Sequence, residues 1–333
     1  MLKCSFCGRH AVYHRRYAGV FLCDRCLARS VERRFRRTMN EHELVSPGER
    51  IGVAVSGGKD SVTCMHLMVD YCRRKNCEVV AVSIDEGISG YRDESLSIAK
   101  ENAELLGVEH FVVSFRQAFG LTLDKIVRLA KRKGTGLNPC TYCGVMRRLL
   151  LNRAARELDA DKLVTAHNLD DEVQAIMLNY IRADFSRLYR LGPRYSPREG
   201  FVPRIKPLRE IPEKEIGIYA MLKGIRVHLG NCPYAGGMHT EIREFLNRLE
   251  ENHPNTKFMI LRMFDRMKPF LSGAVSEFRM HRCEICGEPT PSRICKSCEL
   301  LRGLGLGQKQ KTLISPGSKL VRRRARRGAT PPL

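Results

Sequence analysis

The chain of 333 residues contains no tryptophan, no apolar run long enough to cross a membrane and no recognisable secretory leader. A membrane-spanning helix needs roughly 18 or more consecutive apolar residues, and no run approaches that length. Residues 1–4 lead directly into a cysteine-bearing polar segment, which argues against a cleaved leader. The lack of tryptophan and of an aromatic RNA-recognition motif argues against a base-stacking sheet. We therefore expect a cytoplasmic protein without a membrane partner.

Acidic residues are scarce relative to basic ones. The chain has 36 aspartates and glutamates against 58 lysines and arginines, which gives a formal net charge of +22. The basic residues gather in clusters at 33–37, 131–133, 147–148 and 322–327. A single basic cluster is usually a solvated surface, but so large an excess favours a polyanion partner, in particular a nucleic acid.

Disulfides are not expected among the 14 cysteines, because nothing in the sequence directs the chain to an oxidising compartment. Four C-x-x-C knuckles form two pairs, with 15 residues between the first two knuckles and eight between the second two. Two knuckles complete a tetrahedral site of four sulfur ligands, so we predict two structural zinc ions rather than rubredoxin-like iron or redox dithiols. The predicted ligands are Cys4, Cys7, Cys23 and Cys26 for the first zinc, and Cys283, Cys286, Cys295 and Cys298 for the second.

Six cysteines lie outside these knuckles. Three of them, in or just after a helix predicted at 61–72, are expected to be small buried hydrophobes or spare thiols. The other three are Cys140, Cys143 and Cys232. Their spacing fits an iron–sulfur cluster with one open iron, a redox pair, or a persulfide carrier that uses Cys232, and it does not decide among these.

The middle of the chain alternates short β-rich runs with helical patterns. Strands are predicted at 51–55, 79–84, 110–114 and 162–166, and helices at 61–72, 94–106, 121–132, 144–158, 170–181 and 212–222. Apolar strands between amphipathic helices indicate an α/β fold with a parallel sheet that helices cover on both faces. Ligands bind at the carboxyl ends of such strands, and the polar motifs at 56–61, 85–87 and 167–171 all follow strands.

Composition divides the chain into five predicted units. They are an amino-terminal zinc ribbon at 1–30, a basic linker or helix at 31–49, a catalytic domain at 50–270, a carboxyl-terminal zinc ribbon at 280–302 and a basic tail at 309–333. The tail has eight lysines and arginines and no acids, which is typical of disordered segments.

Residues 56–61 read Ser-Gly-Gly-Lys-Asp-Ser and follow the apolar run 51–55 directly. Two glycines let backbone amides approach an anion, and the next helix contributes the partial positive charge of its N-terminus, so we predict a phosphate cradle. A Walker A loop does not fit, because Asp60 follows Lys59 and Val53 stands where the first glycine would be. The segment instead resembles the PP-loop of ATP pyrophosphatases, which cleave ATP to AMP and pyrophosphate.

Six motifs occur in the order found in tRNA 2-thiouridine synthetases of the TtuA and NcsA type. They are SGGKDS (56–61), GISGY (87–91), PCTYCG (139–144), HNLDDE (167–172), PLREIPEKE (207–215) and NCPYA (231–235). With the zinc ribbons, the resemblance covers nearly the whole chain, up to about residue 301. It implies a PP-loop ATP-pyrophosphatase fold with a parallel sheet, flanked by the two zinc ribbons.

The resemblance implies an ATP-dependent tRNA-uridine 2-sulfurtransferase. In the family, ATP adenylates the C2 oxygen of a tRNA uridine, and sulfide then displaces AMP to give 2-thiouridine. A [4Fe-4S] cluster with one open iron is thought to hold that sulfide, which arrives from a thiocarboxylated ubiquitin-like protein or as free sulfide. Segments 203–215 and 245–250 look closest to the archaeal NcsA and eukaryotic wobble-uridine group, so uridine 34 is the expected target, with uridine 54 as the alternative. A homodimer is also expected.

The resemblance assigns an ATP site with Mg²⁺. Its residues are Ala54, Val55, Ser56, Gly57, Gly58, Lys59, Asp60, Ser61, Ile84, Arg147, Ala166 and Asp171. Within it, the two glycines and two serines bind phosphate, and the apolar residues line the base and ribose. Lys59 would offset charge on the leaving pyrophosphate, and Asp60 would hold Mg²⁺.

Cys140, Cys143 and Cys232 are the cluster ligands that the resemblance implies, and the first and third of them are expected to take part in catalysis. Asp171 matches an acid that the family places near the cluster and ATP, where it would handle the proton of the target base. The alternative for Asp171 is a helix-start carboxylate.

The sequence departs from the family at two positions. Ala166 stands where relatives have glycine, and a methyl group is expected to be tolerated there. Arg147 stands where some members have lysine. Because an arginine stays charged, we expect it to contact phosphate rather than to transfer a proton.

Two other functional classes stay open from the residues alone. A non-thiolating PP-loop ligase would need no three-cysteine set. A non-catalytic zinc-ribbon RNA-binding protein would not need the intact motif at 56–61.

Overall fold

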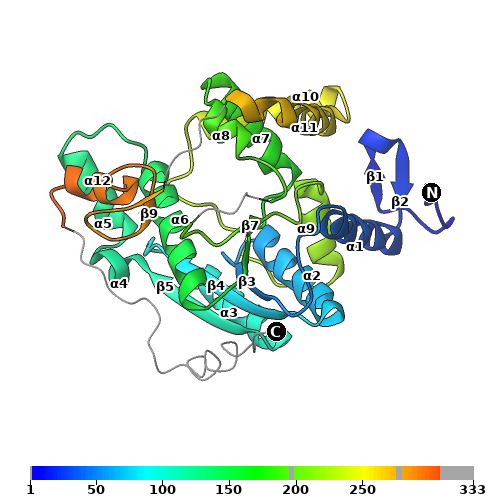
Figure 1. Cartoon of the computed structure of the whole chain (residues 1–333). Helices are drawn as coiled ribbons and strands as arrows, with labels where there is room; N and C mark the ends of the chain where they lie inside the picture. The colour runs from blue at the N-terminus through cyan, green and yellow to red at the C-terminus, as the bar shows by residue number, and fades with distance from the viewer. Residues whose placement is uncertain (1, 195–198, 275–279, 308–333) are drawn as a thin grey trace, which may run out of the picture.

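A five-stranded parallel sheet forms the centre of the computed structural model, which describes residues 2–194, 199–274 and 280–307 (Figure 1). The strand order is β5-β4-β3-β6-β7. The strands are β3 (Arg50–Ala54), β4 (Glu78–Asp85), β5 (Glu109–Ser114), β6 (Lys162–Val164) and β7 (Arg204–Ile205). The order reverses between β3 and β6, and ligands of open parallel sheets bind at such a switch point.

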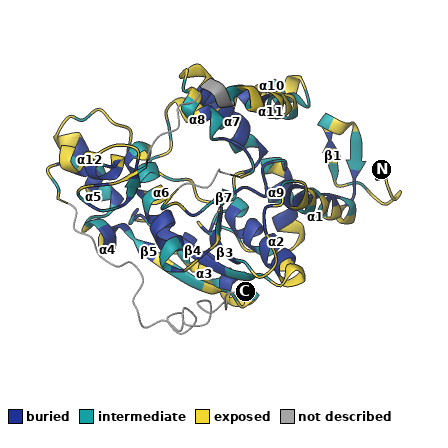
Figure 2. Cartoon of the chain, in the orientation of Figure 1, coloured by how far each residue is buried: buried dark blue, intermediate teal, exposed yellow. Residues whose placement is uncertain are grey.

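The two faces of the sheet bury alternate residues of the same strands. Ile51, Val53 and Ala81 belong to one hydrophobic core, whereas Val80 and Val82 belong to the other. The first core is covered by α1 (Asp24–Glu41), α2 (Lys59–Lys75), α3 (Arg92–Leu106) and α9 (Glu213–Leu222), and the second by α5 (Leu123–Arg132), α6 (Pro139–Glu157) and α12 (Lys296–Gly303). The predicted parallel sheet with helices on both faces is therefore confirmed, and Figure 2 shows its interior as buried.

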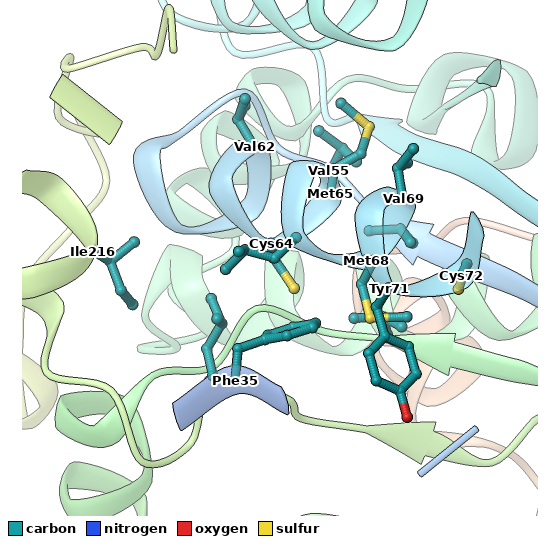
Figure 3. Close-up of a cluster of buried hydrophobic side chains, with 14 of the residues drawn as sticks. Phe35, Val55, Val62, Cys64, Met65, Met68, Val69, Tyr71, Cys72 and Ile216 are labelled. Atoms are coloured by element: carbon teal, nitrogen blue, oxygen red, sulfur yellow. The ribbon is translucent and has the colours of Figure 1, made fainter. Parts of the chain in front are cut away.

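The spare cysteines of α2 pack in the first core. Cys64 and Cys72 are buried among Phe35, Met68 and Tyr71 (Figure 3), and Cys77 is half-buried just beyond the helix. Burial raises the pKa of the Cys72 thiol to about 12. These two buried thiols therefore act as small apolar side chains, as expected.

A separate helical lobe lies beyond β6 and β7. It consists of α7 (Leu169–Ile181), α8 (Phe185–Tyr189), α10 (Met238–Asn252), α11 (Thr256–Met267) and the 3-10 segment η2 (Lys268–Ala274). Leu169, Val173, Leu246 and Phe264 form its own hydrophobic core. In Figure 1 the lobe stands at the top of the view, above β7 and α9.

Each end of the described chain carries a small β-hairpin next to its cysteine knuckles. The first consists of β1 (Tyr13–Arg15) and β2 (Val20–Leu22), joined by η1 (Arg16–Ala18), and projects from α1 (Figure 1). The second, β8 (His281–Arg282) with β9 (Pro289–Thr290), precedes α12. The predicted tail at 309–333 lies outside the described residues.

Several elements differ from the predicted ranges. The helix predicted from Gly144 begins at Pro139, because the Asn138 side chain caps the amide of Cys140 and proline is favoured at a first helical position. The short helix α4 (Phe115–Phe119) and the two-residue β7 were not predicted. Helix α1 begins inside the first ribbon and continues through the predicted linker to Glu41. None of the described helices is long and apolar enough to cross a membrane.

Candidate active site

The loop at 56–61 connects β3 to α2, and three contacts hold its backbone. Arg92 donates to the carbonyl oxygens of Ser56, at 2.7 Å, and of Ile84. The amide of His228 donates to the carbonyl of Gly57 at 2.9 Å. Within the loop, Ser61 Oγ accepts from the amide of Ser56 at 3.0 Å. A network of this kind fixes the loop before any anion arrives.

Gly57 occupies a position that only glycine fits. Its φ is +89°, and a Cβ there would lie 2.0 Å from the carbonyl oxygen of Ser95 in α3. Gly58 has no such restriction, since its φ is −72° and a Cβ would meet only Ser56 Oγ at 3.5 Å. The two loop glycines therefore differ: Gly57 permits tight packing against α3, and Gly58 borders the cavity beside the loop.

We expect Gly57→Ala to lower the free energy of unfolding by about 3 kcal/mol or more, because it adds both backbone strain and a clash with a backbone atom. Gly58→Ala should cost no more than about 1 kcal/mol, the scale of a changed N-cap, yet still weaken ATP binding, because Gly58 lines the cavity beside the loop. Urea unfolding and ATP titration of both variants measure this. Equal stability of the two variants would contradict the assignment.

A cavity of about 290 Å³ opens beside the loop at the carboxyl ends of β3, β4 and β6. All the residues predicted for ATP line it except Gly57 and Lys59. The lining residues are Ala54, Val55, Ser56, Gly58, Asp60, Ser61, Val82, Ile84, Glu86, Arg92, Arg147, Leu151, Thr165, Ala166, His167 and Asp171. The switch point of the sheet therefore holds a cavity with an apolar end and a polar end, as nucleotide sites do.

Four polar residues of this cavity were missed by sequence reasoning: Glu86, Arg92, Thr165 and His167. Glu86 is buried between Arg92, at 2.8 Å, and Arg147, at 3.6 Å. Glu86 and His167 lie in the predicted motifs at 85–87 and 167–171, so their place after strands was the available signal. Nothing in the sequence marked the partners of Glu86, which come from two different helices.

His167 stays neutral in this setting. The protein around its ring desolvates the charged form, and the charges of Lys206 and Arg147 reinforce this, so its pKa is lowered to about 3. Its Nδ1 lies 3.0 Å from Thr165 Oγ1, while its ring remains open to the cavity. A neutral imidazole can therefore face a ligand here without adding charge.

Asp171 lies in the first turn of α7 and forms a reciprocal cap with Asn168. Its carboxylate accepts from the amide of Asn168, and the Asn168 side chain accepts from the amide of Asp171. Burial, reinforced by the neighbouring carboxylates Asp60 and Glu213, raises the pKa of Asp171 to about 7. A cavity carboxyl that titrates near neutral pH is a candidate general base.

Lys59 does not reach the cavity wall. Its Nζ lies 2.5 Å from Glu213 Oε1 of α9 and 3.0 Å from Asp60 Oδ2. Asp60 also accepts from the Asn168 side chain at 3.1 Å, so two donors orient its carboxylate on the wall. The structure thus places Asp60 on the wall of the cavity and Lys59 behind it.

Cys140, Cys143 and Cys232 lie near one another and near Arg147, which lines this cavity. Cys140 and Cys143 lie in the first turn of α6, and the Cys140 thiol donates to the carbonyl oxygen of Tyr234 at 3.2 Å. Burial raises the pKa of Cys143 to about 11, and the charge of Arg147 opposes that rise. Arg147 belongs to both neighbourhoods, because it lines the cavity and lies one turn from Cys143.

Their donor chemistry fits an iron–sulfur cluster better than a single ion. Among the described residues, groups whose ligand atoms all lie within 4.8 Å of one another are the two four-cysteine sets, and these three thiols are not such a group. Cys232 nevertheless lies close enough to raise the pKa of both Cys140 and Cys143. Three thiolates set further apart suit a multi-iron cluster with one iron left open.

The two four-cysteine groups fit tetrahedral zinc. Within each, all four sulfur atoms lie within 4.8 Å of one another. Cys23 and Cys295 precede α1 and α12 directly, so each site fixes the start of a helix. Both predicted zinc ligand sets are therefore brought together. The second ribbon is tied to α6 by Glu288, which binds Arg153 at 2.8 Å and Arg156 at 2.6 Å.

We expect metal analysis to find two zinc ions per chain. Cys283→Ser should release one of them and lower the melting temperature by roughly 5 °C or more, because the second ribbon packs on the helix that carries Cys140. Cys77→Ser, outside both groups, should keep two zinc ions and serves as the control. An unchanged zinc content in Cys283→Ser would contradict the assignment.

The fold and this site define the class of the protein. A family model described as a PP-loop domain matches residues 27–228, and the chain belongs to that family. Within it, the chain belongs to the NcsA-type tRNA 2-thiolation proteins. The tRNA 2-thiolation protein NcsA of Haloferax volcanii is 37% identical over 324 residues, covering 91% of this chain and 99% of that protein.

Solved and curated relatives agree with this placement. The U34-tRNA thiolase NcsA from Methanococcus maripaludis, solved with its [4Fe-4S] cluster, matches with a TM-score of 0.79 and 34% identity, covering 93% of this chain and 99% of that one. Cytoplasmic tRNA 2-thiolation protein 1 of Anopheles gambiae is 35% identical, covering 92% of each chain. The tRNA-5-methyluridine(54) 2-sulfurtransferase of Pyrococcus horikoshii is 32% identical, covering 90% and 93%.

Proposed function

We propose that this protein is a cytoplasmic, ATP-dependent tRNA 2-sulfurtransferase that converts wobble uridine 34 to 2-thiouridine. The observation that carries the proposal is that the PP-loop cavity and the three-cysteine group lie next to each other at α6. Arg147 lines the PP-loop cavity and lies one helical turn from Cys143, so an activated base and a sulfur-delivering group can meet there. The relatives named for tRNA 2-thiolation and for U34 support the substrate.

ATP binds with its phosphates at the loop and its adenosine at the apolar end of the cavity. Ser56, Gly57, Gly58 and Ser61 bind the phosphates, and Ala54, Val55 and Ile84 line the nucleoside. Asp60, which lines the cavity, would hold the Mg²⁺ that accompanies ATP, as a carboxylate ligand suits that ion. Arg147, always charged, contacts phosphate, and the Ala166 methyl group borders the cavity without closing it.

In the first step, O2 of the uridine attacks the α-phosphorus of ATP and pyrophosphate leaves. Attack makes the N3 proton acidic, and Asp171 accepts it. A pKa near 7 lets this carboxyl take the proton at neutral pH and return it later. In the second step, a sulfur nucleophile attacks C2, AMP leaves, and the proton returns to give the thiocarbonyl with N3–H.

Cys140, Cys143 and Cys232 would hold a [4Fe-4S] cluster. When bound, it would supply an open iron that keeps sulfide near the activated C2. The sulfur donor is a thiocarboxylated ubiquitin-like protein or free sulfide, and the functional unit is a homodimer. The exposed side chains of Cys140 and Arg147 leave this corner open to a donor and to tRNA.

A second candidate target, uridine 54, would undergo the same 2-thiolation reaction. The 32% identity to an enzyme named for uridine 54 makes the T-loop the alternative substrate site. A non-thiolating ligase or an RNA-binding adaptor would leave the three-cysteine group without a use.

The test is anaerobic purification followed by turnover. Iron, acid-labile sulfide and visible absorption are measured first, and the protein is then incubated with ATP, Mg²⁺, sulfide and tRNA. Nuclease mapping should place 2-thiouridine at position 34, with AMP formed in equal amount. Modification at position 54 would show that the target is uridine 54 instead of uridine 34. A colourless protein that still thiolates tRNA would contradict the proposed iron–sulfur cluster.

A further inference from the structure

The segment 206–215 contains the motif PLREIPEKE, to which the proposed mechanism assigns nothing. Five of its six charged side chains form close ion pairs with five different elements. The pairs are Lys206 with Glu172 of α7 (2.5 Å), Arg209 with Asp265 of α11 (2.8 Å), Glu210 with Arg37 of α1 (2.6 Å), Glu213 with Lys59 of α2 (2.5 Å) and Glu215 with Arg15 of the first ribbon (2.6 Å). The last two pairs lie in the first turn of α9.

One face of α9 forms a slot for Lys59. A Cβ at Gly217 would lie 3.7 Å from Lys59 Cδ, so the lysine stem runs along the helix at this glycine. Glu213 lies four residues earlier, on the same face, and receives the ammonium group. Lys59 thereby bridges α9 to Asp60, whose Oδ2 is its second partner at 3.0 Å.

Asp60 is the only member of this bridge that reaches the nucleotide cavity. Its two oxygens each receive one donor, Lys59 on Oδ2 and the Asn168 side chain on Oδ1. A carboxylate oxygen has two acceptor positions, so one remains on each for a cation. Partners behind a metal-binding carboxylate fix its orientation, and their loss weakens metal binding.

The first turn of α9 is itself held from two sides. The amide of Glu213 donates to Asp170 Oδ2 at 2.8 Å, which ties the turn to α7. On the other side, Arg15 binds both oxygens of the fully buried Glu215, at 2.8 and 2.6 Å, and Tyr17 donates to it at 2.5 Å. Arg15 and Tyr17 belong to the first zinc ribbon, whose fold depends on its metal.

We propose that the first turn of α9 positions Asp60 for Mg²⁺·ATP, with Glu213 acting through Lys59 and the first zinc ribbon holding the turn through Glu215. Glu213 and Lys59 are then positioning residues. Lys59 acts on Asp60 rather than on the leaving pyrophosphate. The inference rests on the proposed function, because it assumes that Asp60 meets the cation of bound ATP.

The test is the Mg²⁺ dependence of ATP binding in the zinc-loaded protein. In Glu213→Gln, Asp60 becomes the one carboxylate partner of the Lys59 ammonium group. We expect Lys59 then to draw the Asp60 carboxylate away from the cation. The dissociation constant of ATP with Mg²⁺ should rise about 10- to 100-fold, while the constant measured without added Mg²⁺ stays the same. Glu213→Asp, which restores the charge, should recover part of the loss.

Tyr17→Phe tests the ribbon side by removing one hydrogen bond to Glu215. The dissociation constant of Mg²⁺·ATP should rise roughly two- to tenfold with zinc content unchanged. Arg37→Gln breaks the adjacent exposed pair with Glu210 and is the matched control, expected to bind ATP like the parent. Should Glu213→Gln fail to fold, Lys59→Met removes the same bridge and takes its place.

Equal weakening with and without Mg²⁺ would mean a merely structural role and would overturn the inference, as would unchanged binding in Glu213→Gln. The variant Ser61→Ala distinguishes failure of the positioning role from failure of the proposed function. If Ser61→Ala abolishes ATP binding while Glu213→Gln does not, only the positioning role fails. If Ser61→Ala binds ATP normally, the assignment of the ATP site itself fails.

Discussion

Cys232→Ala is expected to abolish 2-thiouridine formation while leaving ATP binding intact. The thiol lies on the segment that follows His228, whose amide binds the PP-loop, and beside Tyr234, whose carbonyl oxygen accepts from Cys140. Removing one of the three proposed ligands would leave two, too few to hold a cluster with one open iron. Loss of an outer partner of a metal site costs about 10- to 100-fold, so loss of a direct ligand should exceed a hundredfold.

The measurement pairs sulfur incorporation into tRNA with iron content and ATP affinity. Cys77→Ala is the matched control, because this thiol lies outside the site and its Sγ is 3.1 Å from the carbonyl oxygen of Ser46. It should retain full activity and iron. Undiminished turnover in Cys232→Ala would remove this cysteine from the mechanism, and equal losses in both variants would point to general thiol damage.

Features that depend on neighbouring residues could be predicted from the sequence. The zinc knuckles are local, since two cysteines three positions apart already face one metal, and both predicted sets meet in space. The PP-loop is local as well, because strand, glycines and helix follow one another at 50–75. Once the strands are parallel, the motifs after β3, β4 and β6 must meet at one edge, and the cavity lies there.

Features that depend on distant partners could not be predicted. The sequence predicts a catalytic role for Lys59. In the structure its ammonium group binds Glu213, which is 154 positions away along the chain. The same holds for Glu86, whose arginine partners come from α3 and α6, and for Arg15, which is 200 positions from Glu215. A charged residue in a motif indicates that it has a partner, but only the packing of the folded chain identifies that partner.

Asp171→Asn is expected to lower thiolation about 10²- to 10⁴-fold, because the amide cannot accept the N3 proton. In the parent, kcat/KM should rise with pH through about 7, where the carboxyl loses its proton, and this rise should vanish in the variant. The cap should survive, since the amide oxygen of asparagine can still accept from the Asn168 amide. ATP affinity should therefore stay within a few-fold of the parent.

The same substitution has an opposite effect on stability. Burial raises the pKa of Asp171 from 3.8 to about 7, so the folded protein binds this proton more tightly than the unfolded chain, and stability is lost as pH rises between these values. Above pH 7 the variant should exceed the parent by on the order of 1–4 kcal/mol, and near pH 4 the two should be equal. Asp93→Asn, an exposed acid in the first turn of α3, should change neither activity nor its pH dependence. If Asp171→Asn behaved like Asp93→Asn, Asp171 would be a helix-start carboxylate and the proton would need another acceptor.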